Sequence, residues 1–385
     1  MKCKPERVLA DLRALEGLTH GQRLAWTPGW MGAREWLRER AEELPGVVVS
    51  EDAAGNLWAS LPGASSDFVL VGSHIDSVPD GGWLDGALGV LAGLELLRSR
   101  VGSSLPVGLR LVDFADEEGA RFGRSLVGST AATGRLDAEP ELLAAARECG
   151  FTFEADRDRL AGALAYLELH IEQGPVLEGA GLSVCAVDGC AGVERHRVRV
   201  RGETAHAGAA PMDMRDDALV AAARGIVQLT EFARSLGAGT ATVGRIEAAP
   251  GVPTIVPGAV ELVVDLRHPS VDGLAALLDA ARRAFDGEWE RIWQIRPIPF
   301  DDELVALARE ACGHEFTMTS GALHDAAALA PHVPAAMLFV PSKRGISHSR
   351  EEDTAEADLV AGIEAIDRLL DQTIDASSGR PSNSG

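Results

Sequence analysis

The chain has little cysteine and no long apolar run. Its five cysteines are scattered over 385 residues, at Cys3, Cys149, Cys185, Cys190 and Cys312. Thiols so few and so widely spaced do not make a disulfide framework, and their odd number favours a reducing cytoplasm. No apolar run approaches membrane-spanning length, and the N-terminal stretch MKCKPERVLADL lacks the apolar core of a signal peptide. We therefore expect a cytoplasmic protein with no membrane partner.

Positive charge is also scarce. The chain has 36 lysines and arginines against 58 aspartates and glutamates, a formal charge of −22. This acidic excess argues against nucleic acid or an anionic membrane surface as a partner. The sequence contains no P-loop, no dinucleotide-binding glycine pattern and no nucleophile elbow of the serine hydrolases. Neither a bound nucleotide nor a serine nucleophile is therefore indicated.

Short apolar strands alternate with helical patterns in the outer parts of the chain. We expect strands at Gly46–Ser50, Asn56–Ser60, Phe68–Ser73, Gly108–Phe114, Tyr166–His170 and Ala336–Val340. We expect helices at Ala33–Glu43, Ala87–Arg98, Glu141–Glu148 and Ala355–Asp371. This alternation predicts an α/β layered domain.

The middle of the chain has a different order of elements. It predicts a strand at 195–201, a helix at 216–236, strands at 240–246 and 259–266, a helix at 271–285 and a strand at 289–295. The order β-α-β-β-α-β is that of the split βαβ sandwich. Because 385 residues are many for one core, we predict two domains: residues 1–190 with 299–385, and an inserted α+β domain at 191–298. The tail Ala376–Gly385 has a disordered composition.

Polar residues follow four of the predicted strands. His74 ends one strand, Asp116-Glu117-Glu118 follow the second, His170 ends the third, and His348 follows the fourth. Ligands of α/β sheets bind beyond the carboxyl ends of the strands, so we expect these side chains at one edge. A single strand-end histidine is more often structural, but four such exits favour a shared site.

The chemistry that suits this set is a pair of divalent cations about 3.5–4 Å apart with a water between them. Imidazole and carboxylate ligands together suit zinc, with manganese, cobalt or nickel as alternatives. Asp85, eleven residues after His74, can bridge two cations because a carboxylate has two oxygens. Asp76 shares the face of His74 and can accept its other ring N–H. Glu117 and Glu118 are adjacent, so one can bind metal while the other serves as a general base.

Blocks spread from about residue 70 to 350 together resemble one family. They are GSHIDSVPDGGWLDGALGVLAG, FADEEGARFG, LELHIEQGPVLE, GETAHAGAAPMDMRDDAL, SGALHDAAALA and GISHS. As a set they resemble the dinuclear-metal amidohydrolases that include N-carbamoyl-L-amino-acid hydrolases, β-ureidopropionases and allantoate amidohydrolases. Singly, only HIEQGP and the His-x-Asp block come near that specificity. The resemblance implies a mixed-sheet, metallopeptidase-like catalytic domain with an inserted lid and dimerisation domain, and a homodimer.

The resemblance also implies roles for the residues of the expected site. The positions that match metal ligands are His74, Asp85, Glu118, His170 and His348, with Asp85 bridging. Glu117 matches the general base, and Asp76 the residue that holds His74. Relatives that act as peptidases or aminoacylases usually carry an acidic residue at the position of His170. HIEQGP therefore points to hydrolases of ureido groups.

Further residues match contacts to the substrate, and each has a plainer alternative. His206 matches a histidine that reaches the reacting carbonyl from the neighbouring subunit, or it makes a structural hydrogen bond. Arg267 matches the arginine that pairs with the substrate carboxylate, or it is an ordinary strand-end arginine. His324 and Gln173 match weaker contacts; the first can cap a turn and the second can hold a loop.

The chain departs from the family pattern near the substrate. Thr254 stands where the family usually has asparagine, so a shorter side chain with one hydroxyl replaces the donor and acceptor of an amide. The pattern HAGTTPM is HAGAAPM here, without two hydroxyls. Lys343 and Arg344 add two cations before His348, either for an anionic substrate or to balance nearby acids.

The resemblance implies a metal-dependent amidohydrolase that cleaves an N-carbamoyl-L-amino acid to the amino acid, carbon dioxide and ammonia. Allantoate or another ureide is the first alternative, because the motifs would be the same. An N-acyl-amino-acid hydrolase or dipeptidase shares the fold, but His170 argues against it. A binding protein without catalysis would have lost Glu117 or a ligand.

Overall fold

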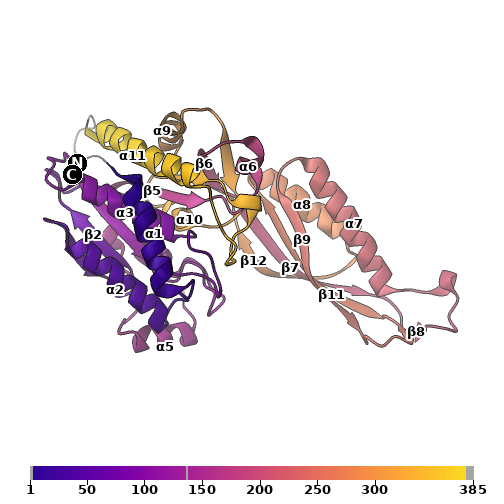
Figure 1. Ribbon diagram of the computed structural model, residues 1–385. Coiled ribbons are helices and arrows are strands. Elements are labelled where there is room, and N and C mark those ends of the chain that lie inside the picture. Colours follow the sequence, from indigo (N-terminus) through magenta and orange to yellow (C-terminus); the bar gives the residue numbers. More distant parts are fainter. Residues whose placement is uncertain (1–2, 136–137, 379–385) are drawn as a thin grey trace. The chain divides into compact units, whose positions relative to one another are not determined.

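The computed structural model describes residues 3–135 and 138–378 and divides the chain into two units (Figure 1). The first unit is Met1–Asp188, Pro299–Met318 and Leu323–Gly385; the second is Gly189–Ile298 and Thr319–Ala322. The short segment 319–322 belongs to the second unit through two hydrogen bonds. The Ala191 N–H donates to the Ser320 carbonyl at 2.8 Å, and Arg267 Nη1 donates to the Gly321 carbonyl at 2.7 Å.

The first unit is built on a mixed sheet. Its strand order is β1 (Val48–Glu51), β2 (Leu57–Leu61), β4 (Gly108–Phe114), β3 (Phe68–His74), β5 (Ala163–Ile171), β15 (Ala335–Val340), β6 (Cys185–Cys190) and β13 (Ile298–Pro299), with β14 (Thr317–Ser320) paired to β6. The neighbours β4, β3, β5 and β15 are parallel. Their carboxyl ends therefore meet at one edge of the sheet.

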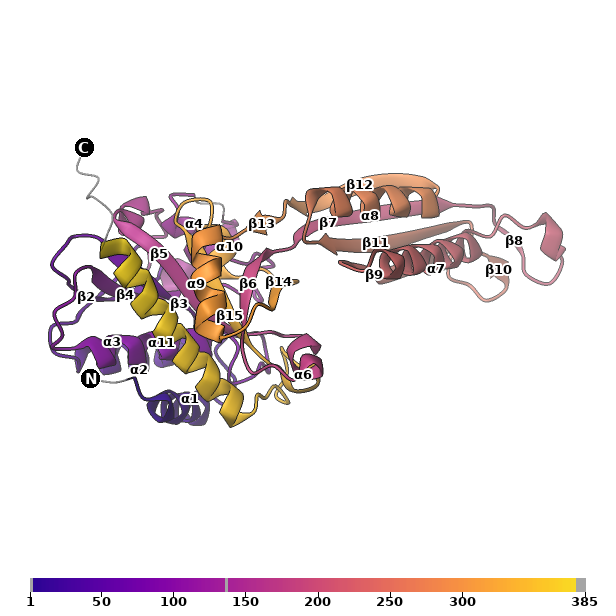
Figure 2. The same ribbon diagram turned by 90° about the horizontal axis from the view of Figure 1, so that it is seen from above.

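Helices cover both faces of this sheet. The helices of the unit are α1 (Pro5–Thr19), α2 (Pro28–Glu42), α3 (Ala87–Arg100), α4 (Val127–Ala132), α5 (Pro140–Glu148), α6 (Val176–Ala180), α9 (Asp302–Cys312), α10 (Asp325–Leu329) and α11 (Glu356–Ser378), with the 3₁₀ turns η1 (Arg157–Leu160) and η3 (Lys343–Gly345). α3 and α11 pack on β3 and β5, and α1 packs on α3 and α11 (Figures 1 and 2). Proline at the first position starts α1, α2 and α5, where its missing N–H costs no hydrogen bond.

The alternation of β5 separates core from site. Leu167, Leu169 and Ile171 join the apolar core beneath α3 and α11. Glu168 and His170 point to the opposite face, because successive strand residues alternate, and both are buried there. That face carries α10, so buried polar side chains gather at the carboxyl edge of the sheet.

The second unit has its own antiparallel sheet, in the order β12 (Gly287–Ile295), β7 (Gly192–Arg201), β11 (Ala259–His268) and β9 (Thr240–Ala249). α7 (Ala218–Leu236) and α8 (Val271–Ala284) bury one face, where Val198, Leu262 and Leu277 are fully enclosed. A two-stranded ladder, β8 (Ala205–His206) with β10 (Ile255–Val256), and the 3₁₀ turn η2 (Met212–Met214) complete the unit.

The predicted fold class is confirmed: a mixed-sheet α/β unit of metallopeptidase type, with an inserted βαββαβ unit. Several details differ from the sequence prediction. The first helix, Pro5–Thr19, was not expected, and neither were the helices α4, α6, α9 and α10 or the strand β6. Ala376–Ser378, predicted to belong to a disordered tail, form the end of α11, and the Ser377 hydroxyl donates to the Thr373 carbonyl at 2.7 Å. Residues 379–385 of that tail lie outside the described residues. Among the described helices, none combines the length and the apolar character that a membrane span requires.

Candidate metal centre

Three side chains from β3, β5 and the loop after β3 form the first ligand group. His74 ends β3, His170 lies near the end of β5, and the loop 75–86 returns Asp85 toward both. Asp85 Oδ1 lies 3.1 Å from His170 Nε2 and 3.8 Å from His74 Nε2. All three side chains are buried, and their ligand atoms fit around one cation.

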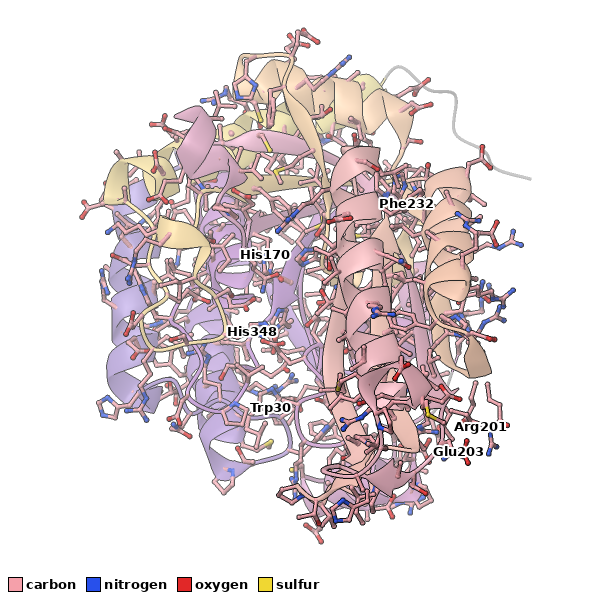
Figure 3. The ribbon with its side chains drawn as sticks, turned by 90° about the vertical axis from the view of Figure 1, so that its right-hand side faces the viewer. Trp30, His170, Arg201, Glu203, Phe232 and His348 are labelled. Carbon is pink, nitrogen blue, oxygen red and sulfur yellow. The ribbon has the colours of Figure 1, made fainter. Side chains whose placement is uncertain are left out.

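A second ligand group uses the other oxygen of Asp85. Asp85 Oδ2 lies 3.2 Å from His348 Nε2, which is 3.3 Å from Glu118 Oε2. His348 lies in the loop after β15, and Figure 3 labels it together with His170. Asp85 thus gives one oxygen to each group, which is the arrangement of a bridging carboxylate.

The side chains in these groups fit divalent cations. Glu118 Oε1 is buried and lacks a hydrogen-bond partner, and the buried His170 Nε2 faces the Asp85 carboxylate at 3.1 Å. Burial alone would lower the pKa of His74, but the carboxylates of Glu117, Asp76 and Asp85 raise it well above its usual value. Burial likewise opposes ionisation of Asp85, yet its contacts with His170 and His348 hold its pKa well below the ordinary range. The carboxylates at this sheet edge thus favour positive charge beside them, and metal ions can supply that charge in place of protons.

Glu117 lies beside the first group without belonging to it. Its Oε2 is 3.7 Å from His74 Nε2, and the residue is buried. Burial, with the charges of Asp325 and Glu118, raises its pKa well above that of a free glutamate despite the opposing effect of His74. A carboxylate so placed, with its proton affinity raised, is suited to accept a proton from water.

Asp76 was expected to hold the ring of His74, but its carboxylate mainly accepts backbone N–H groups beyond the end of β4. Its carboxylate accepts the Glu117 N–H at 3.1 Å and the Glu118 N–H at 3.2 Å. His74 Nδ1 is 3.5 Å from the Asp76 carboxylate but 3.1 Å from the Asp76 carbonyl. The carboxylate therefore chiefly fixes the backbone of Glu117 and Glu118, because two peptide N–H groups at a strand exit need an acceptor.

Strained backbone gathers at the same edge. Asp116, Gln173 and His348 adopt φ values of 55°, 60° and 54°, in the left-handed region that non-glycine residues rarely occupy. Trp26 Nε1 holds the Asp116 carboxylate at 2.6 Å. Such strain persists only where surrounding contacts enforce it, and it clusters at functional sites.

Gln173, predicted to contact the substrate or to hold a loop, lies at the site and contacts the carboxylate of Asp85. Its Nε2 donates to Asp85 Oδ2 at 2.9 Å and lies 3.3 Å from His348 Nε2. His324 is also at the site: its ring centroid lies 4.4 Å from that of His170. Burial and the nearby His170 hold the pKa of His324 well below its usual value, which keeps the ring neutral.

The remaining predicted substrate residues lie in the second unit. Arg267 Nε donates to Asp265 Oδ1 at 2.9 Å, and its side chain is about one third exposed, at 31%. His206 lies on the ladder of β8 and β10, and Thr254 immediately precedes β10, where its carbonyl accepts the Ala207 N–H. His206 Nδ1 accepts the N–H groups of Gly208 and Ala209 at 3.0 and 3.1 Å. A neutral His206 therefore carries its proton on Nε2, where it can donate to an oxyanion.

Sequence reasoning missed Glu352 and Arg23. Glu352 Oε1 accepts the N–H groups of Leu84 and Asp85, each at 3.0 Å, and its Oε2 accepts the Ser347 hydroxyl at 2.9 Å. Arg23 is fully buried and donates to the carbonyls of Ile75 and Gly82 at 2.8 and 3.2 Å. Glu352 follows His348 by four residues, a signal hidden in the charged run Arg350–Asp353; Arg23 gave none.

The two cations that depart from the family pattern have acidic neighbours. Lys343 pairs with Asp353, and Arg344 Nη2 lies 3.0 Å from Glu351 Oε2. The Arg344 N–H also donates to Glu178 at 2.8 Å. These contacts favour the reading in which the pair balances nearby acids.

Comparisons with known proteins agree with this geometry. A sequence model of peptidase family M20/M25/M40 matches residues 70–372. The N-carbamoyl-L-amino acid amidohydrolase of Geobacillus stearothermophilus is 38% identical over 379 residues, which cover 89% of this chain and 91% of the relative. The allantoate amidohydrolase of Escherichia coli (strain K12) is 34% identical, over 91% of this chain and 92% of the relative. A crystal structure of a hydantoinase/carbamoylase family amidase from Burkholderia ambifaria superimposes with a TM-score of 0.87 at 32% identity, covering 97% of this chain and 98% of that one.

Proposed function

Because the chain belongs to peptidase family M20/M25/M40 and, within it, to the hydantoinase/carbamoylase amidases, we propose that it hydrolyses N-carbamoyl-L-amino acids. Membership of this group makes it a hydrolase of linear C–N bonds. The products of the proposed reaction are the free amino acid, carbon dioxide and ammonia. The relative from Geobacillus stearothermophilus, at 38% identity, supports this choice of substrate.

The observation that carries the proposal is the imidazole of His170. It completes the first ligand group with Nε2 at 3.1 Å from Asp85 Oδ1, at a position where peptidase-type relatives usually carry an acid. A second neutral imidazole makes this group one charge less negative than an acid would. The substitution favours ureido substrates over peptides.

Glu117 is the proposed general base. The ligand groups His74–Asp85–His170 and Asp85–Glu118–His348 would hold the metal ions. Divalent ions so held lower the pKa of a water and polarise a carbonyl. Glu117 takes the proton of the attacking water on its carboxylate and returns it to the leaving nitrogen, because it is free of both ligand groups. Asp76 keeps Glu117 at its place through the backbone N–H.

Arg267 and His206 are the proposed contacts to the substrate carboxylate and to the oxyanion. They lie at opposite ends of the second unit: β11 runs from Ala259, beside the β8–β10 ladder, to Arg267 eight residues later. Eight residues of strand span about 27 Å. One molecule therefore does not bring both side chains to one small substrate, which supports a His206 supplied by a partner subunit.

A homodimer through the second unit would supply that histidine. β9 is an edge strand of the sheet, and it exposes Ile246, while α7 exposes Val220 and Val227. An edge strand beside exposed apolar side chains is suited to pairing with a second copy.

Hydrolysis of a panel of substrates tests the proposal, with free amino acid measured for the amino-acid derivatives and ammonia measured for the ureido compounds. The panel contains N-carbamoyl, N-formyl and N-acetyl amino acids, a dipeptide and allantoate, each with added zinc, manganese or cobalt. We expect release from the N-carbamoyl compounds. Release from allantoate alone would favour the second candidate, which the relative from Escherichia coli supports. Release of free amino acid from only the N-acyl amino acids or the dipeptide, without ammonia from any ureido compound, would remove the ureido assignment.

A further inference from the structure

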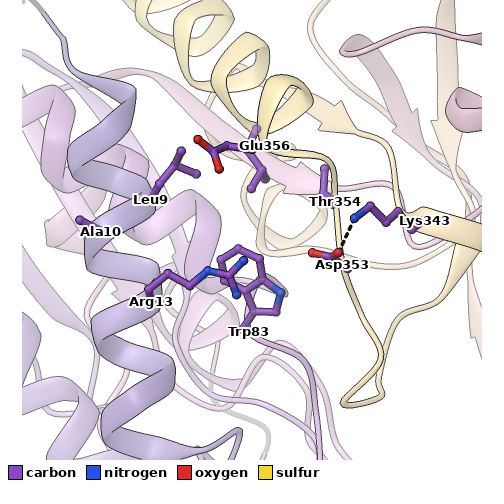
Figure 4. A pocket seen from close by; sticks show the side chains of 9 residues that line it. Leu9, Ala10, Arg13, Trp83, Lys343, Asp353, Thr354 and Glu356 are labelled. Carbon is purple, nitrogen blue, oxygen red and sulfur yellow. Dashed lines mark hydrogen bonds and ion pairs between the residues drawn. The ribbon is translucent and has the colours of Figure 1, made fainter.

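A hollow of about 410 Å³ lies in the first unit, apart from the candidate metal ligands (Figure 4). It is bounded by α1, by the loop before Asp85 and by the start of α11. Its lining comprises Leu9, Ala10, Arg13, Trp83, Lys343, Asp353, Thr354, Glu356 and Leu359. The volume falls in the range of small-molecule sites, about 300–1,000 Å³.

The hollow carries one cation and one anion that have no ion-pair partner among residues 3–135 and 138–378. Arg13 is exposed, and its guanidinium lies 3.5 Å from the centre of the Trp83 ring. Glu356 lies in the first turn of α11 with its carboxylate exposed. Lys343 and Asp353 face the same space but pair with each other, as the dashed line in Figure 4 marks. Arg13 and Glu356 are therefore the groups left to bind a ligand.

The charges select the chemical class of that ligand. A dicarboxylate or a phosphate would meet the repulsion of Glu356, and a simple amine would meet that of Arg13. A zwitterion satisfies both, since its carboxylate accepts from the guanidinium fork and its ammonium donates to the glutamate. The apolar side chains of Leu9 and Leu359 offer contact to an aliphatic side chain.

The walls of the hollow adjoin the hydrogen bonds that hold Asp85. Trp83 immediately precedes Leu84, and Asp353 immediately follows Glu352. Glu352 and Leu84, which adjoin the lining residues Asp353 and Trp83, are in contact. Glu352 Oε1 accepts the N–H groups of Leu84 and Asp85, each at 3.0 Å. A molecule bound against Trp83 and Asp353 would therefore lie next to the backbone that positions Asp85.

We propose that this hollow is a regulatory site for a free α-amino acid, with its carboxylate on Arg13 and its ammonium on Glu356. Occupancy changes turnover through the contacts of Glu352 with Leu84 and Asp85. The ligand belongs to the chemical class of the product of the proposed reaction, so the regulatory meaning rests on the proposed function. Binding itself does not.

Calorimetric titration with L-leucine and L-methionine tests the site. The metal-loaded enzyme carries Arg267→Gln, so that binding of the carboxylate at the catalytic site is weakened. We expect Arg13→Gln and Glu356→Gln each to weaken binding about tenfold, and leucinamide and N-acetylleucine, which each lack one charge, to bind at least tenfold more weakly. Equal binding of the amide, or binding unchanged by Arg13→Gln, overturns the proposal, as does the absence of binding.

Two control variants match the test variants in kind. Arg40→Gln removes another guanidinium over a tryptophan, 4.3 Å from the Trp36 ring on α2, and Asp358→Asn removes another acid from the first turn of α11. Both lie outside the lining of the hollow, and we expect binding to be unchanged in them. Weakening by the controls as large as that by the test variants would show a general charge effect and overturn the assignment.

Steady-state kinetics tests the regulation in the enzyme with Arg267 intact. Added L-leucine is expected to change kcat in the unsubstituted enzyme and to leave kcat unchanged in Arg13→Gln, whereas competition at the catalytic site alters KM in both. Binding with no change in kcat overturns the regulatory role and leaves the site. If no ureido compound is hydrolysed, the proposed function fails, and the titration still decides whether the site exists.

Discussion

Two regions, the carboxyl edge of the sheet in the first unit and the solvent face of β7 in the second, use charged side chains in opposite ways. In the first, Asp85, Glu117 and His170 are buried at a sheet edge, and each has a shifted pKa. In the second, arginines at alternate positions of β7 pair across strands in the open: Arg199 with Glu261, at 3.0 Å, and Arg201 with Glu288, at 2.6 Å. The same residue types thus make a reactive centre where water is excluded and a solvated surface where it is not.

Glu117→Gln is expected to have the largest effect, and it tests the buried charged residues of the first unit. We expect kcat to fall by about 10³-fold or more, because the amide cannot accept the proton of water. Metal content, measured on the purified variant, is expected to stay at the level of the unsubstituted enzyme, since Glu117 is in neither ligand group. Normal turnover of the Glu117→Gln variant would contradict the proposed mechanism, and loss of its metals would indicate that Glu117 is a metal ligand.

His206→Ala and Arg267→Ala test whether the second unit contributes to chemistry as well as surface. Each is expected to lower kcat/KM by about 10²–10³-fold, since each removes a contact to the substrate or to the oxyanion. Dissociation and remixing of the two variants in equal amounts is then expected to restore about one quarter of the active sites. Half of random dimers are mixed, and each mixed dimer has one site with both side chains. No recovery on mixing, with dimers shown by light scattering, would contradict a His206 shared between subunits.

Glu352→Ala tests the buried support behind Asp85. We expect metal affinity and kcat to fall by about 10–100-fold, because two backbone N–H groups and the Ser347 hydroxyl lose their acceptor. Glu352→Gln keeps one carbonyl oxygen for the backbone and is expected to restore part of the loss. Its neighbour Glu351 is exposed and pairs with Arg344, so Glu351→Gln is the matched control. An equal effect of both substitutions would argue against positioning by Glu352.

Arg201→Gln is expected to have the smallest effect, and it tests the exposed ion pairs of the second unit. Its pair with Glu288 is 71% and 60% exposed, so we expect the free energy of unfolding to change by less than about 1 kcal/mol, with kcat unchanged. Denaturant melts of the variant and of Glu288→Gln measure this. A loss of clearly more than about 1 kcal/mol in either variant would mean that the charged face of the second unit is covered in the working protein.

Strand exits were predictable because their signals are local. The apolar run 68–71 ending in His74, and the run 336–340 before His348, mark strands and the residues that follow them. Parallel pairing of neighbouring strands then brings these ends together, as β3, β5 and β15 show. The shared use of Asp85 by two ligand groups was expected from its two carboxylate oxygens and from the family resemblance, while its distances required the structure.

The roles of Glu352 and Arg23 and the hollow beside Trp83 could not be predicted from the sequence. Glu352 contacts backbone groups 267 and 268 residues away, and no spacing rule relates them. Arg23 binds the carbonyls of a loop more than fifty residues later, at Ile75 and Gly82. Such contacts depend on how helices and loops far apart in the chain pack together, which local patterns do not encode.

The sequence by itself determined the family, the fold class and the residues at the strand exits, because periodicity and motif spacing are properties of short segments. Tertiary structure alone decided that Asp76 chiefly holds the backbone of Glu117 and Glu118, and that Glu352 fixes Asp85. It also showed that Lys343 and Arg344 are matched by Asp353 and Glu351. These are questions of which groups meet across the fold, and for the buried Asp76 and Glu352 the partners matter most, because buried polar groups are nearly always hydrogen-bonded.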